Sequence, residues 1–188
     1  MISTRDMVKI SLNLVVVYVV GGALLAAVYI KTSPIIYQNS VKEKKAALEK
    51  IMPEANRIEK LGEWTIHDKK AEYYRAKKDS LVCGYCIESY GKGYSSLIHV
   101  LLAVDTACRV KRMSVLSHAE TPGLGDEIEA GWFKNQFAGK TSAQMKVLKS
   151  ATKENIQAIS GATISSRAVT EDAVKSALEQ LARTQKGN

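Results

Sequence analysis

Cysteine, proline and aromatic residues are all scarce in this chain of 188 residues, which has three cysteines, three prolines and 6% aromatic residues. Three cysteines are too few for the disulfide framework that holds small secreted domains together. The chain also has no internal repeat and no low-complexity linker. Hydrophobic residues make up 46% of the chain and charged residues 24%, which is ordinary for a globular domain and too apolar for a disordered one.

Motifs for independent catalysis are absent as well. There is no Walker motif, no H-E-x-x-H metal motif, no nucleophile elbow and no spacing typical of a catalytic triad. The net charge of +8 comes from basic residues interleaved with acidic ones, as in "VKEKKAALEK", without the basic stripe and stacking aromatics of a nucleic-acid binder. We therefore expect a solvated surface, no nucleic-acid partner, no catalytic residue and no metal site.

The three cysteines include a C-x-x-C pair, Cys83 and Cys86, in the stretch "SLVCGYCIESY". This stretch reads as a strand, and residues three apart on a strand point to opposite faces. No second cysteine pair or histidine cluster completes a metal site. We expect Cys83, Cys86 and Cys108 to be structural, unless a bulge at Gly84 turns the first two to the same face.

Charge is missing altogether between Lys9 and Lys31. Residues 10–30 form an apolar run of about 21 residues, which as a helix is about 31 Å long and matches the ~30 Å core of a bilayer. A cleaved signal peptide has an apolar core of only ~7–15 residues followed by a small-residue cleavage site, whereas this run is longer and ends in bulky residues. We expect a single transmembrane helix anchored in the lipid bilayer.

The charges that flank this run do not decide on which side of the membrane the rest of the chain lies. Arg5 and Lys9 precede the run, and several lysines follow it closely. Counted naively, the positive-inside rule places the large domain in the cytoplasm, but the rule weakens for long translocated domains.

Strand-like segments dominate the middle of the chain, after an imperfect amphipathic helix that ends near Pro53. Four β-branched or aromatic runs separated by turns predict an antiparallel meander of three or four strands: 71–78, 80–90, 95–105 and 108–118. Strands followed by helices indicate an α+β domain, an antiparallel sheet with packed helices. The predicted organisation is a tail (1–9), a transmembrane helix (10–30), an amphipathic stalk helix (31–53), the α+β domain (54–183) and a C-terminal tail (184–188).

Turn chemistry and helical spacing describe the last third of the chain. Thr121-Pro122-Gly123 suits a type II turn, and a helix carrying acidic residues in its first turn is expected after it. A final helix is predicted over 162–183 from apolar residues at helical spacing: Ile164, Ala168, Ala173, Val174, Ala177, Leu178 and Leu181.

The stretch "ISGATISS" stands at the start of that final helix. Free backbone N–H groups and the helix dipole favour an anion there, Gly161 and Ala162 allow a bulky group to come close, and Thr163 offers a hydroxyl. This pattern suggests a phosphate-bearing ligand. Simple N-capping by Ser160 or Thr163 is the alternative, and the four residues alone favour the cap.

A second cluster of polar residues and glycines lies in "HAETPGLGDEI", directly after a strand. The Gly-x-Gly spacing is weak evidence alone and does not open a Rossmann helix. His118 and Glu120 stand two residues apart, and such a pair is more often joined by a loop hydrogen bond than used as an acid–base dyad.

Taken together, the N-terminal anchor, "GKGY", "SHAETPGLGDEI", "FKNQFAGK" and "ISGATISSRAVT" occur in an order that resembles the FMN-binding domains of the RnfG/NqrC type, over nearly the whole chain. The resemblance is closest to the RnfG type, the FMN-binding subunit of the Rnf electron-transport complex, and the modest length of the chain favours it over the longer NqrC type. Two departures, Ser95-Ser96 after "GKGY" and a glycine-free "DTAC" turn, concern only the geometry of turns.

The resemblance implies a covalent cofactor. In such proteins FMN is joined through its phosphate to the last threonine of the SGAT-type motif, here Thr163, by a separate flavin transferase. The resemblance implies that the cofactor site includes the following residues: Gly93, Tyr94, His118, Glu120, Thr121, Pro122, Gly123, Leu124, Gly125, Ser160, Gly161, Ala162 and Thr163.

The function implied by this resemblance is electron transfer in a membrane complex that links ferredoxin and NAD redox chemistry to Na⁺ or H⁺ translocation. The domain is then expected on the extracytoplasmic face of the cell membrane, against the naive charge count. Three alternatives remain open: the corresponding subunit of a Na⁺-translocating NADH:quinone reductase, a non-redox regulatory or scaffold domain, and a basic module that binds anionic lipids.

Overall fold

The computed structural model describes residues 4–186 and divides the chain into two compact units, residues 1–44 and residues 45–188. A single helix, α1 (Thr4–Ile51), forms the described part of the first unit and begins the second. The transmembrane and stalk helices predicted as neighbours are therefore one continuous helix, with Pro34 inside it. It ends two residues before Pro53, because a proline disfavours helical geometry in the residue that precedes it.

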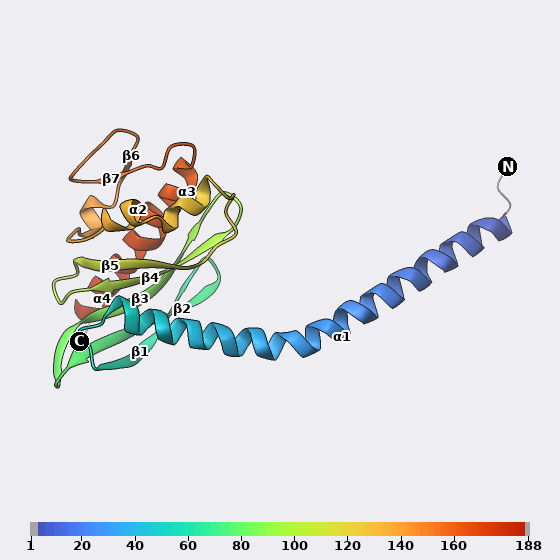
Figure 1. Ribbon diagram of the computed structural model, residues 1–188, viewed down its shortest axis with the longest axis horizontal. Coiled ribbons are helices and arrows are strands. Elements are labelled where there is room, and N and C mark those ends of the chain that lie inside the picture. Colours follow the sequence, from blue (N-terminus) through green and yellow to red (C-terminus); the bar gives the residue numbers. More distant parts are fainter. Residues whose placement is uncertain (1–3, 187–188) are drawn as a thin grey trace. The chain divides into compact units, whose positions relative to one another are not determined.

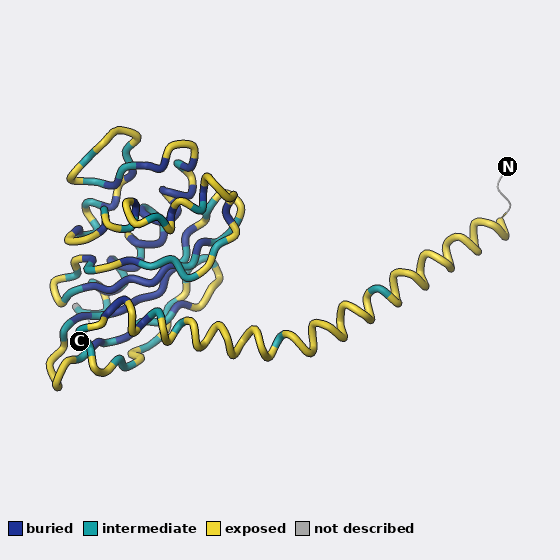
Figure 2. The backbone as a smooth tube through the Cα atoms, viewed as in Figure 1, coloured by how far each residue is buried: buried dark blue, intermediate teal, exposed yellow. Residues whose placement is uncertain are grey.

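The first unit consists of exposed helix. Its apolar side chains lie on the surface of α1, and Figure 2 shows this exposure along most of the helix. Within the described residues, α1 is the helix long and apolar enough to cross a membrane, judged by length and composition. An apolar helix surface without protein partners is what a lipid-facing span presents.

The second unit is built on a five-stranded antiparallel meander with strand order β1-β2-β3-β4-β5. Its strands are β1 (Arg57–Ile66), β2 (Lys69–Lys78), β3 (Leu81–Lys92), β4 (Leu97–Val104) and β5 (Val110–Ser117). The four predicted strands are confirmed as β2 to β5. β1 was not predicted, because its sequence "RIEKLGEWTI" is rich in charge and its alternation is broken by a register shift between Lys60 and Gly62.

Both faces of the sheet are covered (Figure 1). One face supplies alternate residues such as Ile87, Val100 and Leu102 to the main core, where they meet the helices of the C-terminal half. The other face supplies Cys86 and Leu101 to a smaller core. Leu48 and Ile51 from the last turns of α1, and Met52 directly after it, complete this core. Because both faces are buried, β4 reads as an almost continuous apolar run.

Short elements connect β5 to the final helical run. They are the 3-10 helix η1 (Gly125–Glu129), α2 (Gly131–Asn135), the 3-10 helix η2 (Ser142–Gln144) and the parallel pair β6 (Val147–Leu148) and β7 (Ile156–Gln157). The helix predicted after Gly123 is thus split in two, because Ala130 adopts an extended conformation with φ −61° and ψ 139°.

The final helix is continuous but not uniform. It begins as α3 (Thr163–Arg167), passes through the π-helix η3 (Ala168–Val174) and ends as α4 (Lys175–Lys186). Gly91 of β3 faces the π-helical segment so closely that a Cβ there would lie 2.0 Å from the carbonyl oxygen of Ala168. The predicted buried face is confirmed from Ala168 onward, whereas Ile164 is 54% exposed, so its assignment to the core face is wrong.

Both cysteines of the C-x-x-C pair pack on the same face of the sheet and not on opposite faces, which is the exception that the sequence analysis allowed for a bulge at Gly84. A bulge in β3 leaves Cys83 without a partner between the pairs Lys77↔Val82 and Ala76↔Gly84, and both Cys83 and Cys86 pack against the smaller core. Three residues of strand span roughly 10 Å, beyond the ~7 Å between Cα atoms that a disulfide can bridge. Burial, followed by the nearby Cys83, raises the pKa of the Cys86 thiol to about 12, so this thiol is unreactive at neutral pH.

Candidate functional site

Three segments that are distant in sequence meet around a cavity of about 450 Å³. They are the turn between β3 and β4, the loop after β5, and the start of α3. The cavity is lined by Tyr94, Glu120, Thr121, Leu124, Gly125, Gly161, Ala162, Thr163, Ile164 and Ser165. The three motifs singled out in the sequence therefore form one site.

Thr163 is the first residue of α3 and lines the cavity. Ala162 is the N-cap and no side chain caps the helix, so the structure uses neither Ser160 nor Thr163 as a cap. The N–H groups of a first helical turn have no acceptor within the helix, and the run that begins here continues to Lys186. A hydroxyl thus stands beside free backbone donors.

The loop before Thr163 is shaped for close approach. Gly161 has φ +79°, a left-handed conformation that glycine adopts without strain, and a Cβ at this position would lie 3.1 Å from Leu124 Cδ2. The buried Ser166 hydroxyl holds the loop in place: it donates to the carbonyl oxygen of Ala162 at 2.9 Å and accepts from the amide of Ile159 at 2.9 Å.

Glu120 is buried at the centre of the site and is 5% exposed. Its carboxylate accepts hydrogen bonds from the amides of Tyr94 (3.1 Å), Ser95 (3.0 Å) and Ser96 (3.1 Å), and from the Ser165 hydroxyl (2.5 Å). Burial alone would raise the pKa of Glu120, but these hydrogen bonds outweigh burial and hold the pKa below its usual value. The side chain is therefore ionised at neutral pH.

His118 does not form an acid–base dyad with Glu120. Its Nδ1 accepts the backbone amide of Glu120 at 3.1 Å, which is the loop hydrogen bond favoured from the sequence, and its Nε2 lies 3.0 Å from Glu129 Oε1. Gly123 has φ +73°, as the third position of a type II turn requires, so the predicted turn agrees with the backbone.

Large apolar side chains form the rim of the cavity. Tyr94 is 73% exposed, Ile164 54% and Leu124 46%, although each has a large hydrophobic surface. Exposed apolar groups gathered around a cavity mark a binding surface. These side chains suit a flat aromatic ring system, and the Thr163 hydroxyl and the helix start, which line the same cavity, suit a phosphate.

Most of the predicted site residues line the cavity, and some do not. Five lie outside the lining: Gly93, His118, Pro122, Gly123 and Ser160. Ile164 and Ser165 line it without having been predicted as site residues. Ile164 was assigned to the core by helical spacing. Ser165 lies in the first turn of α3, and its hydrogen bond to Glu120 shows its role.

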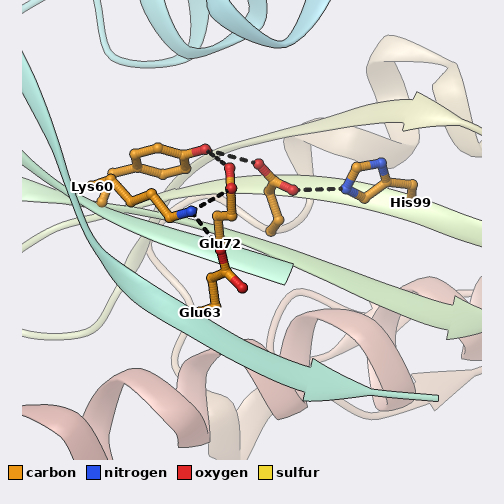
Figure 3. A network of polar contacts seen from close by, with 6 residues as sticks. Lys60, Glu63, Glu72 and His99 are labelled. Atoms are coloured by element: carbon orange, nitrogen blue, oxygen red, sulfur yellow. Dashed lines mark hydrogen bonds and ion pairs between the residues drawn. The ribbon is translucent and has the colours of Figure 1, made fainter. Parts of the chain in front are cut away.

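A second polar cluster lies on the sheet face that the end of α1 covers (Figure 3). Its members are Lys60, Glu63, Glu72, Tyr74, Glu88 and His99. Lys60 Nζ donates to Glu63 and Glu72 at 2.6 Å each, the Tyr74 hydroxyl donates to Glu72, and Glu88 lies 3.3 Å from His99 Nε2. Among the described residues no group of three or more His, Cys, Asp or Glu side chains is arranged to hold a metal ion, so this cluster is a charge network between strands.

Residues 93–179, which include all three segments of the cavity, match the FMN-binding domain family. Along most of its length the chain is 35% identical to the G subunit of the proton-translocating ferredoxin:NAD(+) oxidoreductase complex of Clostridium ljungdahlii, with 92% of this chain and 90% of that protein aligned. The chain belongs to the RnfG family of ion-translocating oxidoreductase subunits. Another member, the G subunit of the ion-translocating oxidoreductase complex of Methanosarcina acetivorans, is 31% identical over 95% of this chain and 96% of its own length.

The fold of this RnfG-type protein is also similar to solved structures of NqrC proteins. The crystal structure of Shewanella oneidensis NqrC superposes with a TM-score of 0.52 and 25% identity, covering 61% of this chain and 62% of that one. The corresponding protein of the Na(+)-translocating NADH-quinone reductase from Parabacteroides distasonis gives a TM-score of 0.51 and 25% identity over 60% of this chain and 61% of its own. The predicted α+β fold with an FMN-binding type of domain is thereby confirmed.

Proposed function

We propose that this RnfG-type protein is a membrane-anchored electron carrier with FMN attached covalently through its phosphate to Thr163. It works in a complex that passes electrons from ferredoxin to NAD⁺ and couples this reaction to ion translocation, as the names of its relatives describe. The observation that carries the proposal is the position of the Thr163 hydroxyl. It lies at the start of a long helix, in the one cavity that the three family motifs share.

The residues present fit such a group. The N–H groups of the first turn and the helix dipole would stabilise a phosphodiester on Thr163. Gly161 and the buried Ala162 leave room beside it. The apolar rim of Tyr94, Leu124 and Ile164 provides a surface for the flavin ring. When bound, FMN supplies the capacity to accept and release electrons, while the protein positions it.

Thr163 is an acceptor and does not activate itself. No side-chain hydrogen bond caps α3 at Thr163, and the resemblance to the family assigns activation of the reaction to a separate transferase. Attachment therefore needs a flavin transferase and an activated flavin, a flavin dinucleotide. The Thr163 oxygen bonds to the flavin-side phosphorus, the bond from that phosphorus to the bridging oxygen breaks, the nucleotide monophosphate leaves with the electron pair, and the transferase accepts the hydroxyl proton.

The membrane arrangement follows from α1 and from the covalent link. α1 spans the bilayer through residues 10–30 and holds the domain at the membrane, where the other subunits of the complex are its partners. The resemblance to the family places the domain on the extracytoplasmic face, where covalent attachment would keep the cofactor from being lost by diffusion.

Fluorescence of the denatured protein tests the proposal. Protein produced together with a flavin transferase should show flavin fluorescence after denaturing electrophoresis. Thr163→Ala and the similarly shaped Thr163→Val should abolish the fluorescence, and Thr106→Ala, in an exposed turn, should keep it. Denaturation-resistant flavin on Thr163→Ala would refute the attachment site.

A quinone-reductase complex is the second candidate, since the NqrC structures share this fold. The G subunits of Clostridium ljungdahlii and Methanosarcina acetivorans align with more than 90% of the chain, whereas the two NqrC-type structures cover about 60%, which favours the first candidate. The proteins that copurify with the tagged chain distinguish the two complexes.

A further inference from the structure

Glu120 connects the three segments of the flavin site. It lies in the loop after β5, and its two carboxylate oxygens reach both of the other segments. Oε1 accepts the amides of Ser95 and Ser96 and the Ser96 hydroxyl at 3.0 to 3.4 Å, whereas Oε2 accepts the amide of Tyr94 at 3.1 Å and the Ser165 hydroxyl at 2.5 Å. Five donors thus converge on one buried side chain.

The packing around this carboxylate explains two glycines. A Cβ on Gly93 would lie 2.5 Å from Glu120 Oε1 and 2.7 Å from the carbonyl oxygen of Ser96. A Cβ on Gly125 would lie 2.8 Å from Glu120 Cβ and 2.9 Å from Ser165 Oγ. Neither glycine has a positive φ, so both are needed for space and not for conformation. Gly93 of "GKGY" and Gly125 of "ETPGLG" therefore leave the space that the Glu120 carboxylate and its donors occupy.

The same contacts exclude two other roles for Glu120. A carboxylate that already accepts five hydrogen bonds from protein donors has little capacity left to take a proton from Thr163 or to bind a flavin atom. What it can do is fix geometry. Ser165 lies two residues after Thr163 on the first turn of α3, so holding Ser165 holds the acceptor hydroxyl relative to Tyr94 and to the loop that carries Leu124.

We infer that Glu120 is the positioning residue of the flavin site: through Ser165 and the 94–96 amides it sets Thr163 and the cavity rim in the arrangement that accepts the flavin phosphate. The inference rests on the proposed attachment at Thr163. It predicts that Glu120 affects the rate of flavin attachment once the transferase is bound more than it affects how tightly the transferase binds. The reason is that misplacing a reacting group, here the Thr163 hydroxyl, by about 1 Å costs on the order of a hundredfold in rate.

Steady-state flavin transfer to the full chain in detergent micelles tests this role, with a flavin transferase and flavin adenine dinucleotide as the probe. We expect Glu120→Gln to lower kcat for attachment by about tenfold or more with KM for the acceptor protein nearly unchanged. We expect Ser165→Ala to lower kcat by about threefold, and the double variant to be no slower than Glu120→Gln, because both changes break one unit. Glu127→Gln, an exposed residue of η1, is the matched control.

The outcomes separate the two proposals. Wild-type protein that takes up no covalent flavin refutes the proposed function and the inference with it. Wild-type protein that is flavinylated, with Glu120→Gln reacting at the wild-type kcat, overturns the inference alone. If circular dichroism shows that Glu120→Gln is unfolded, the variants Ser165→Ala and Ser96→Ala take its place as the test. Attachment at the wild-type kcat in both of them would overturn the inference.

Flavin fluorescence anisotropy adds a readout, since loss of positioning should lower the anisotropy of the attached flavin.

Discussion

At the scale of single residues, a buried polar side chain limits the size of the side chains that can lie next to it. The Glu120 carboxylate is removed from water and stabilised by five protein donors. A buried charge is tolerated only when it is hydrogen-bonded in this way. The donors can come that close only if the adjacent positions carry no side chain, which is why Gly93 and Gly125 flank it.

Gly93→Ala should therefore destabilise the domain. The new methyl group would meet the Glu120 carboxylate and the Ser96 backbone, and such overpacking costs about 1–3 kcal/mol. Gly131→Ala is the control, because a Cβ there meets nothing within 4 Å, and we expect it to be neutral or slightly stabilising. Thermal unfolding of both variants, followed by circular dichroism, measures the difference. An unchanged midpoint for Gly93→Ala would contradict this packing.

Some residues of the candidate site can be predicted from the sequence, whereas others are identified only by tertiary contacts that leave no pattern in the sequence. Thr163 and the glycines were predicted from their motifs. The serines after "GKGY" looked like a departure confined to a turn, yet the amides of Ser95 and Ser96 bind Glu120. Ser165 was not predicted because its partner lies 45 positions earlier in the chain. The glycine-free turn before Arg109 is held by Asp105, whose carboxylate accepts the amides of Ala107 and Arg109 at 2.9 and 2.8 Å.

At the scale of elements, an ionic contact fastens the end of α1 to β5. Arg112 Nη1 donates to the carbonyl oxygen of Ile51 and to Glu54 Oε2, both at 3.1 Å, and Lys111 pairs with Glu54 Oε1. The hydrogen bond from Lys111, assisted by Arg112 and opposed by burial, lowers the pKa of Glu54 from 4.5 to about 2. The last residues of α1 are thereby held on the smaller core.

The pH dependence of stability tests this contact. Because the folded-state pKa of Glu54 is depressed, its contribution is complete above pH 4.5 and is lost as the pH falls toward 2. We expect Glu54→Gln to lower the free energy of unfolding by about 1 kcal/mol at pH 7, a value reduced by solvent screening. The difference from wild type should shrink between pH 5 and pH 3. Glu49→Gln, exposed on α1, should match wild type throughout, and a gap for Glu54→Gln that is independent of pH would rule out the ionic origin.

Elements with a clear period were predictable, and irregular ones were not. The β-branched and aromatic runs of β2 to β5 and the final helix agree with the sequence analysis. The π-helix was not predicted, and the close approach of its first residue, Ala168, to Gly91 of β3 is a tertiary contact that helical spacing does not record. The position of Cys83 depends likewise on a bulge, a tertiary feature that one glycine only suggests.

At the scale of the whole molecule, a long apolar helix and an FMN-type domain occur in one chain. The side of the membrane on which the domain lies can be measured directly by cysteine labelling. The three native cysteines are first replaced by alanine, and a single cysteine is introduced at the exposed position 153 (Lys153→Cys). This cysteine should react with a maleimide that cannot cross the cell membrane, on intact cells whose envelope lets the reagent reach the outer surface of that membrane. Asp6→Cys should react only after lysis. The reverse pattern would place the domain in the cytoplasm.

Intact-mass spectrometry of the native protein tests the central claim most directly. The account predicts a mass increased by one FMN less one water, an increment that survives denaturation and maps to the peptide containing Thr163. An unmodified mass for protein isolated from its assembled, active complex, or an increment on any other residue, would contradict the account.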